Sequence, residues 1–140
     1  MEYRRFNDTL IIRMDRGEEI VAQLCAIAER ESVRLASVEA LGAVNDFTVS
    51  VYNVAEKQFY RNRFEGAYEI VSLTGTLTTR NGKVYPHLHM SAGDQTGAVF
   101  GGHLNSAVVS ATCEMVVRVL DGTVERETDP QVGLNVFRFV

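Results

Sequence analysis

The hydropathy pattern of the chain changes near Val33, and this change determines which fold classes are possible. In residues 18–32, just before this point, the apolar residues recur at helical spacing: Ile20, Val21, Leu24, Ile27 and Ala28. They predict one amphipathic helix that opens with Glu18 and Glu19 in its first turn and ends near Glu31-Ser32. After Val33 the alternating and β-branched pattern predicts strands to the end of the chain. The expected fold class is α+β, a mostly antiparallel sheet with one helix covering one face.

Short turns separate the predicted strands. The strands span residues 10–14, 33–40, 47–54, 57–64, 68–79, 84–92, 98–103, 106–120, 124–128 and 134–140. Asn45-Asp46, Asn81-Gly82 and Asp121-Gly122 are the predicted turns, and Asn-Gly is typical of a two-residue hairpin. No internal repeat stands out, so we expect residues 1–140 to form a single domain.

All three histidines of the chain, His87, His89 and His103, lie within a stretch of seventeen residues. His87 and His89 are two apart, so on a strand both rings leave the same face. A hairpin return puts His103 opposite His87 if the turn centres near Gln95, and opposite His89 if it centres near Thr96. Either register gathers three imidazoles on one face, whereas a slip of one residue turns His103 away.

Three converging imidazoles suit Zn²⁺ or another transition metal, with a coordination position left open. Leu88, Met90 and Ala92 alternate with the histidines, so the rings are predicted to leave the less apolar face. They would line a cleft, a subunit boundary or an open surface. Zinc is the expected ion, although imidazoles also bind Cu, Ni, Fe and Co.

Glu69 is an acidic side chain that the strand pattern places on one face with Val71 and Leu73. A carboxylate on an apolar face is costly unless it is paired or coordinated. Glu69 is therefore a candidate general base, metal ligand or partner of an imidazole N–H. The alternative is that residue 69 lies in water at the edge of the strand.

The charge of the chain argues against non-specific binding to nucleic acid. The chain contains fourteen basic and eighteen acidic residues, so its net charge is -4 and its pI is about 5.4. Lys57, Arg61 and Arg63 form a basic cluster interleaved with aromatic residues. We interpret this cluster as an exposed edge strand, whose charges discourage edge pairing, rather than as a surface that binds an anion or nucleic acid.

Neither a signal peptide nor a membrane-spanning run is expected. The N-terminus leads directly into polar residues, and the longest apolar stretch, residues 108–117, contains Glu114. Cys25 and Cys113 are isolated, and nothing in the sequence requires an oxidising compartment. A cytoplasmic protein without a membrane partner is expected.

Three motifs together resemble the PPC domain family (plants and prokaryotes conserved). They are Gly66-Ala67-Tyr68-Glu69-Ile70-Val71-Ser72-Leu73-Thr74-Gly75, Pro86-His87-Leu88-His89-Met90-Ser91 and Val99-Phe100-Gly101-Gly102-His103-Leu104. The likeness extends from the first strand to Phe139. It implies a compact α/β domain that assembles as a homotrimer. Family members with all three histidines use them as a metal site, and His87, His89 and His103 match those positions.

The resemblance also implies an association with DNA, which this sequence supports poorly. Plant relatives carry AT-hooks before the domain, bind A·T-rich DNA, and keep a Glu at the position of Glu69 while lacking the histidines. Stand-alone prokaryotic members are commonly named as DNA-binding proteins. Here no Arg-Gly-Arg-Pro core exists, since Arg16-Gly17 is followed by Glu18-Glu19. The chain therefore has no arginine arm of the kind that reads the minor groove.

Two functions follow from these observations. The first is a trimeric binding module that holds a metal, expected to be zinc, in a regulatory or DNA-associated role. The second is a metal-dependent enzyme of the hydrolase type, which uses a metal-activated water and Glu69 as base. A small-molecule ligand is compatible with either. An open pocket with Glu69 within reach would favour the enzyme, and a site closed by a fourth protein ligand would favour a structural metal.

Overall fold

The structure is a computed structural model that describes residues 1–140. It contains one helix and eight strands: β1 (Glu2–Phe6), β2 (Thr9–Asp15), α1 (Ile20–Arg30), β3 (Ala36–Asn53), β4 (Gln58–Arg80), β5 (Lys83–Gly93), β6 (Val99–Val119), β7 (Val124–Asp129) and β8 (Leu134–Phe139). The mostly antiparallel sheet with one helix agrees with the expected fold class. The helix is too short and too polar to cross a membrane.

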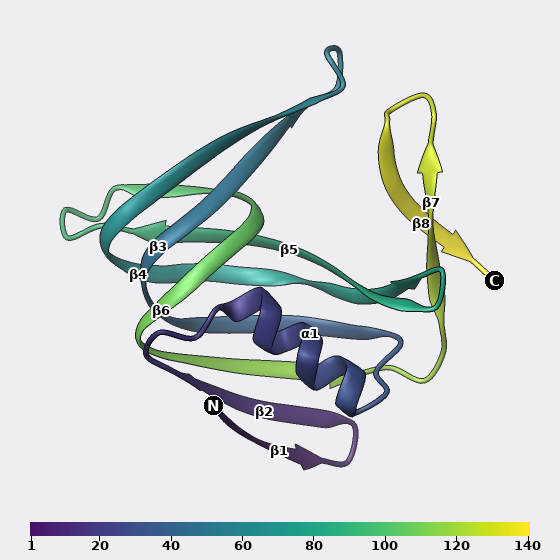
Figure 1. The fold of residues 1–140 in the computed structure, drawn as a ribbon, viewed down its shortest axis with the longest axis horizontal. Helices are drawn as coiled ribbons and strands as arrows, with labels where there is room; N and C mark the ends of the chain where they lie inside the picture. Colours follow the sequence, from purple (N-terminus) through teal and green to yellow (C-terminus); the bar gives the residue numbers. More distant parts are fainter.

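The strands follow the order β1-β2-β6-β3-β4-β7-β8, and β5 pairs with both β4 and β6. Because β6 also pairs with β3, and β3 with β4, the strands β3, β4, β5 and β6 form a closed circuit of neighbours (Figure 1). All pairings are antiparallel except one bridge between β4 and β7, at Thr79 and Glu125. The circuit joins the histidine-bearing strands β5 and β6 to the long β3–β4 hairpin.

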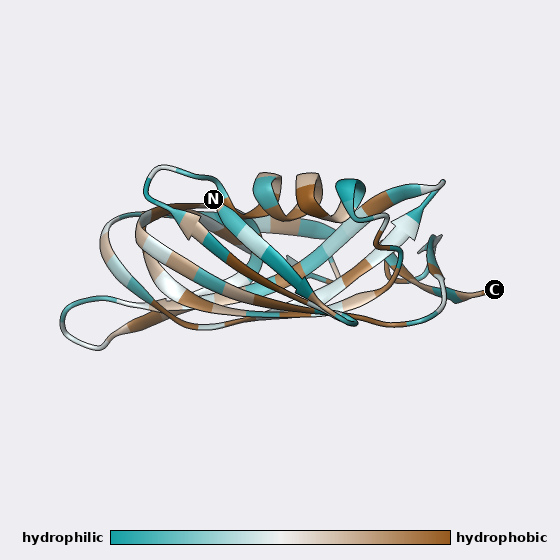
Figure 2. Ribbon diagram, turned by 90° about the horizontal axis from the view of Figure 1, so that it is seen from below, coloured by the Kyte–Doolittle hydropathy of each residue, from teal (hydrophilic) through white to brown (hydrophobic).

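Helix α1 lies against one side of the curved sheet (Figure 2). The sequence placed Glu18 and Glu19 in its first turn, but the helix begins at Ile20 and Glu19 is the N-cap. The Glu19 carboxylate accepts hydrogen bonds from the backbone N–H groups of Val21 (3.2 Å) and Ala22 (2.7 Å). It also accepts one from Ala107 of β6 (2.9 Å), so the cap ties the helix to the sheet.

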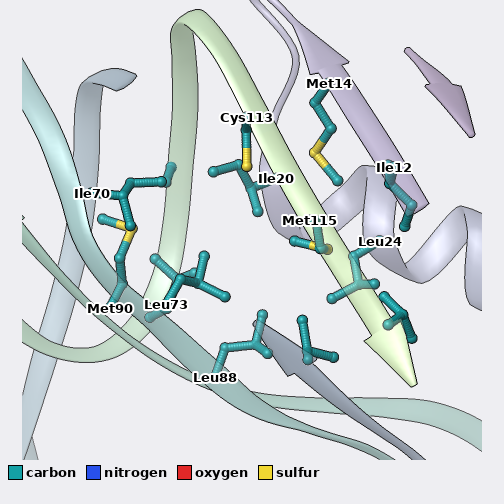
Figure 3. Packing of buried hydrophobic residues seen from close by; sticks show 14 of the residues in the cluster. Ile12, Met14, Ile20, Leu24, Ile70, Leu73, Leu88, Met90, Cys113 and Met115 are labelled. Atoms are coloured by element: carbon teal, nitrogen blue, oxygen red, sulfur yellow. The ribbon is translucent and has the colours of Figure 1, made fainter. Parts of the chain in front are cut away.

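The core lies between α1 and the sheet and contains 25 buried apolar residues. Leu24 of α1 packs in this layer with Met115 of β6, while Leu88 and Met90 come from the inner face of β5 (Figure 3). Each such buried side chain contributes about 1.5–3 kcal/mol by leaving water. The inner face of β5 is therefore fixed by packing, which also fixes its outer face.

Three pairs of predicted strands are in fact single long strands. Residues 33–40 and 47–54 were expected to be separated by a turn at Asn45-Asp46, but β3 runs through both. Residues 57–64 and 68–79 are joined in β4, and residues 98–103 and 106–120 are joined in β6. Register shifts between Ala40 and Gly42 and between Val44 and Asp46 bend β3 without ending it. A β-bulge gives the same local sequence signal as a turn.

The two ends of the sheet also differ from expectation. Asn81-Gly82 forms the predicted hairpin turn, with positive φ at both residues, but Asp121-Gly122 does not. The strand after Asp121-Gly122, β7, pairs with β8 and β4 and not with β6. An additional strand, β1, which the sequence analysis did not predict, pairs with β2. Its alternation is weak because its side chains are mostly exposed.

Candidate metal centre

The structure brings His87, His89 and His103 together on the outer face of β5 and β6. His89 lies directly opposite His103, which is the register predicted for a turn centred near Thr96. The ring centroids are 5.2 to 5.6 Å apart, and one ligand nitrogen from each ring lies within 4.8 Å of the others. The three imidazoles therefore form one cluster drawn from two adjacent strands.

Alternation and two glycines explain why this cluster forms. Leu88 and Met90 are each 2% exposed on the inner face of β5, so the histidines between them must point outward. A Cβ at Gly101 would lie 2.7 Å from the carbonyl oxygen of Met90, and one at Gly102 would lie 2.6 Å from that of Ser50. The glycines let β6 approach both neighbouring strands, which sets the position of His103.

The cluster lies in a cleft of about 680 Å³, which we call the histidine cleft. Its lining comes from the β3–β4 hairpin, β5, β6 and the β7–β8 hairpin: Ser50, Val51, Tyr52, Val54, Phe59, Tyr85, His87, His89, Gly102, His103, Gly133, Leu134 and Asn135. The Tyr52 hydroxyl donates to the carbonyl oxygen of Val132 (2.7 Å), and Lys57 Nζ donates to that of Pro130 (2.7 Å). These two contacts connect the β3–β4 hairpin to the β7–β8 hairpin.

Arg126 of β7 lies behind the cleft and is 7% exposed. Its guanidinium donates to three neutral oxygens: Thr78 Oγ1 (3.1 Å), Thr76 Oγ1 (3.4 Å) and Asn135 O (3.0 Å). Tyr85 and Phe137 flank it, with their ring centroids 5.1 and 4.3 Å away. No carboxylate lies within ion-pair distance of this guanidinium. Its buried charge is therefore stabilised by dipoles and aromatic faces alone.

The surroundings keep at least two of the imidazoles neutral. Burial lowers the pKa of His87 to about 4, and the nearby charge of Arg126 adds to the effect. Burial, and then His89, lowers the pKa of His103. Arg126 Nη2 lies 3.4 Å from His87 Nδ1, and a guanidinium can only donate, so this contact also requires a neutral ring. A neutral imidazole is the form that binds a metal.

The donor set fits a divalent transition metal. A tetrahedral metal with bonds of about 2.1 Å holds its ligand nitrogens about 3.4 Å apart. One nitrogen from each ring lies within 4.8 Å of the others, so the rings would have to turn toward one another to bind a metal. If the three histidines held a metal, they would leave a fourth coordination position for an exogenous ligand from the adjoining cleft.

Glu69 is not brought to the histidines within the chain. It pairs with Gly93, four residues along β5 from His89, which is roughly 13 Å at about 3.3 Å per residue. A register shift between Ile70 and Ser72 puts Leu73 on the inner face, while Glu69 and Val71 are exposed. The predicted face shared with Leu73 is therefore wrong. Glu69 lines a different hollow, together with Tyr68 and Asp94.

The basic cluster lies on an edge, as the sequence suggested. Residues 58–65 of β4 pair with β3 alone. Arg63 forms an ion pair with Asp46, with contacts of 3.0 and 2.7 Å, and so is not free to bind an anion. The neighbouring Phe59 has a role that the sequence did not indicate, because its ring lies 5.5 Å from that of His103 in the histidine cleft.

Sequence reasoning missed Ser50 and Arg126 as residues of this region. Ser50 is 1% exposed, lines the cleft, and its hydroxyl has no hydrogen-bond partner. Arg126 occurs in the charged run of β7, which reads as a solvent-exposed strand. The one available signal was alternation, because Arg126 shares a strand face with Val124.

Comparison with known proteins identifies the family. The profile of the Plants and Prokaryotes Conserved (PCC) domain matches residues 1–121. The chain belongs to this family. The PCC domain is the PPC domain that the three sequence motifs resemble, so the predicted resemblance is confirmed. No curated protein is significantly similar to the chain.

Three solved structures are similar over nearly their full lengths. A protein from Bacteroides thetaiotaomicron, provisionally described as DNA-binding, has 29% identity and a TM-score of 0.96, covering 99% of this chain and 96% of its own. The metal-containing protein AF0104 from Archaeoglobus fulgidus has 31% identity and a TM-score of 0.90. The match covers 99% of this chain and 97% of AF0104. A plant- and prokaryote-conserved protein from Pyrococcus horikoshii has 24% identity and a TM-score of 0.86. The match covers 99% of this chain and 94% of the Pyrococcus protein.

Proposed function

We propose that this PPC domain binds one divalent transition metal through His87, His89 and His103, and that zinc is the ion. The observation that carries the proposal is the convergence of three imidazole nitrogens within 4.8 Å in an accessible cleft. The similar protein AF0104 is metal-containing, which supports the same use of this fold. The metal would supply Lewis-acid chemistry at the floor of the cleft.

Calorimetric titration of chelator-treated protein with Zn²⁺ tests the proposal. We expect saturation at about one zinc per chain, with proton release small near pH 7 because His87 and His103 are already neutral. His89→Ala should abolish the high-affinity phase. Glu69→Gln is the matched control and should titrate as wild type. Zinc uptake that is unchanged in His89→Ala would contradict the assignment.

A hydrolase-type enzyme is the second candidate, favoured by the cleft that adjoins the histidines. Glu69 lines a different hollow from the histidines of its own chain. It could therefore act as the base only in the histidine cleft of another subunit. Assays of the zinc-loaded protein against ester and amide substrates, with His103→Ala and Glu69→Gln beside wild type, test this candidate. Activity that depends on His103 but not on Glu69 would support the enzyme hypothesis and exclude Glu69 as its general base.

A DNA-associated or regulatory role is proposed on the basis of relatives such as the Bacteroides protein. The net charge of -4 and the ion-paired Arg63 give such a role little electrostatic support. Anisotropy titrations with an A·T-rich duplex at low and moderate salt would test it. Affinity that falls steeply with salt supports direct binding, and no binding at low salt contradicts it.

We also propose that the chain assembles as a homotrimer in the cytoplasm. The outer face near β2 and β3 exposes Ile11 (45%) and Leu41 (59%) beside a hollow of about 490 Å³, which suits burial against another copy. Both cysteines are free, which suits a reducing compartment. Light scattering should give the trimer mass for wild type, and Leu41→Glu should lower it. A monomeric wild type would contradict the assembly.

A further inference from the structure

The contents of the histidine cleft indicate which class of ligand it takes. None of its thirteen lining residues is acidic, although three of them are histidines. The buried guanidinium of Arg126 lies directly behind His87 and has no counter-ion. A divalent metal would add two further positive charges, so the site needs a negative charge that the chain does not supply.

Two hydroxyl groups in the cleft have hydrogen-bonding capacity that the protein leaves unused. Ser50 is directly opposite His103 in the β3–β6 pairing, and its Oγ is buried without any partner. An unsatisfied buried hydroxyl costs about 1–3 kcal/mol, so an acceptor that reached it would be favoured. The Tyr85 hydroxyl accepts from Asn135 Nδ2 (3.1 Å) and donates to no protein acceptor.

Three apolar side chains of the cleft lining are exposed. Val51 is 58%, Val54 is 55% and Phe59 is 41% exposed. Its volume of about 680 Å³ falls within the range of small-molecule sites. An inorganic anion would fill only the floor and leave this apolar surface in water.

We infer that the histidine cleft binds a small organic carboxylate, whose charge faces the metal and whose apolar body covers Val51, Val54 and Phe59. Ser50 and Tyr85 donate hydrogen bonds to the carboxylate, and Arg126 supplies positive charge from behind His87. Arg126 is a positioning residue, since it contacts the cleft through His87, Tyr85 and Asn135. The inference rests on the proposed metal site and adds the chemistry of its ligand.

Titration of the cobalt-loaded full chain with benzoate tests the inference, because the visible spectrum of Co²⁺ changes when a ligand enters its coordination shell. Benzamide has the same shape without the charge and is the matched probe. We expect benzoate to bind at least about tenfold more tightly than benzamide. Phosphate should bind more weakly than benzoate, since it cannot cover the apolar walls.

Three variants separate ligand recognition from folding. Ser50→Ala should keep its cobalt, unfold at the same or a higher urea concentration, and bind benzoate about tenfold more weakly. Arg126→Gln should lose most of the preference for benzoate over benzamide, while Arg126→Lys should retain it. Arg118→Gln, at an exposed arginine without an ion pair at the other end of β6, should behave as wild type.

The outcomes are distinguishable. A chain that takes up no cobalt overturns the proposed metal site, and the inference with it. Cobalt uptake with equal affinities for benzoate and benzamide overturns the inference alone. Phosphate binding tighter than benzoate binding overturns the assignment to a carboxylate. A Ser50→Ala variant with wild-type benzoate affinity removes Ser50 from the site.

Discussion

The two sides of the histidine cleft are held in different ways. On the floor, β5 and β6 pair with each other and with β4 and β3, and the residues between the histidines are buried in the core. The wall formed by the β7–β8 hairpin has one backbone bridge to β4, and side chains make the other connections. The three histidine rings thus lie on the side held by strand pairing, and the opposite wall is the more weakly attached one.

Gly75→Ala should break the floor and have the largest effect. Gly75 of β4 pairs with Leu88, and an added Cβ would overlap the carbonyl oxygen of His87. Because backbone atoms must move, we expect a loss of about 3 kcal/mol in the free energy of unfolding and a loss of zinc binding. Urea unfolding followed by circular dichroism measures the free energy of unfolding, and calorimetric titration measures zinc binding.

Gly93→Ala is the matched control for this change. Gly93 is in the same strand pair, but a Cβ there would meet nothing closer than 3.6 Å. Its stability and zinc binding should stay close to those of wild type. Equal losses in the two variants would show that β4 and β5 are not packed as closely as described.

Zinc should stabilise the floor by an intermediate amount. A ligand that binds the native state alone at a hundred times its dissociation constant adds about 2.7 kcal/mol to the free energy of unfolding. Thermal unfolding with and without zinc measures this effect. His87→Ala should show no zinc-dependent shift in melting temperature, and a shift equal to that of wild type would contradict the site.

Tyr52→Phe should loosen the wall and leave the floor unchanged. The hydroxyl of Tyr52 donates to Val132 in the loop between β7 and β8, and its removal should cost about 1 kcal/mol. Hydrogen exchange should quicken in residues 124–139 and remain slow in β5. Tyr60→Phe is the control, since the Tyr60 hydroxyl contacts the exposed Glu56 of the β3–β4 turn. Faster exchange in β5 would remove the distinction between the two sides.

The stability of the metal-free protein should depend on pH through His87. The pKa of His87 is about 4 in the folded chain against about 6.5 when unfolded. As pH falls below 6.5 the unfolded chain takes up a proton that the folded chain does not, so stability declines until about pH 4. Urea midpoints across this range should fall less steeply for His87→Gln. Identical slopes would contradict the neutral, partly buried ring.

The histidine cluster could be predicted from sequence because it depends on local periodicity. Alternation fixes which face His87 and His89 occupy, and a short turn limits His103 to two registers. The structure selects the register that pairs His89 with His103. The helix could be predicted for the same reason, since its apolar stripe is contiguous in the chain.

Features that depend on long-range pairing could not be predicted. A bulge and a turn use similar residues, so β3 and β4 were each divided into two strands. Arg126 and His87 are in contact although 39 positions separate them in the sequence. The hydroxyl of Ser50 is buried without a partner only because β6 packs beside it, which the sequence does not reveal. Glu69 is exposed, as in the alternative that the strand pattern left open, because the register shift after Ile70 separates its face from that of Leu73.

Elemental analysis of untagged protein by mass spectrometry would show whether the three histidines hold a metal. Wild type would be compared with His87→Ala and His103→Ala, and Arg118→Gln would serve as a folded control. We expect about one zinc per chain in wild type and in the control, and almost none in either histidine variant. No bound metal in wild type, or metal retained in both histidine variants, would contradict it.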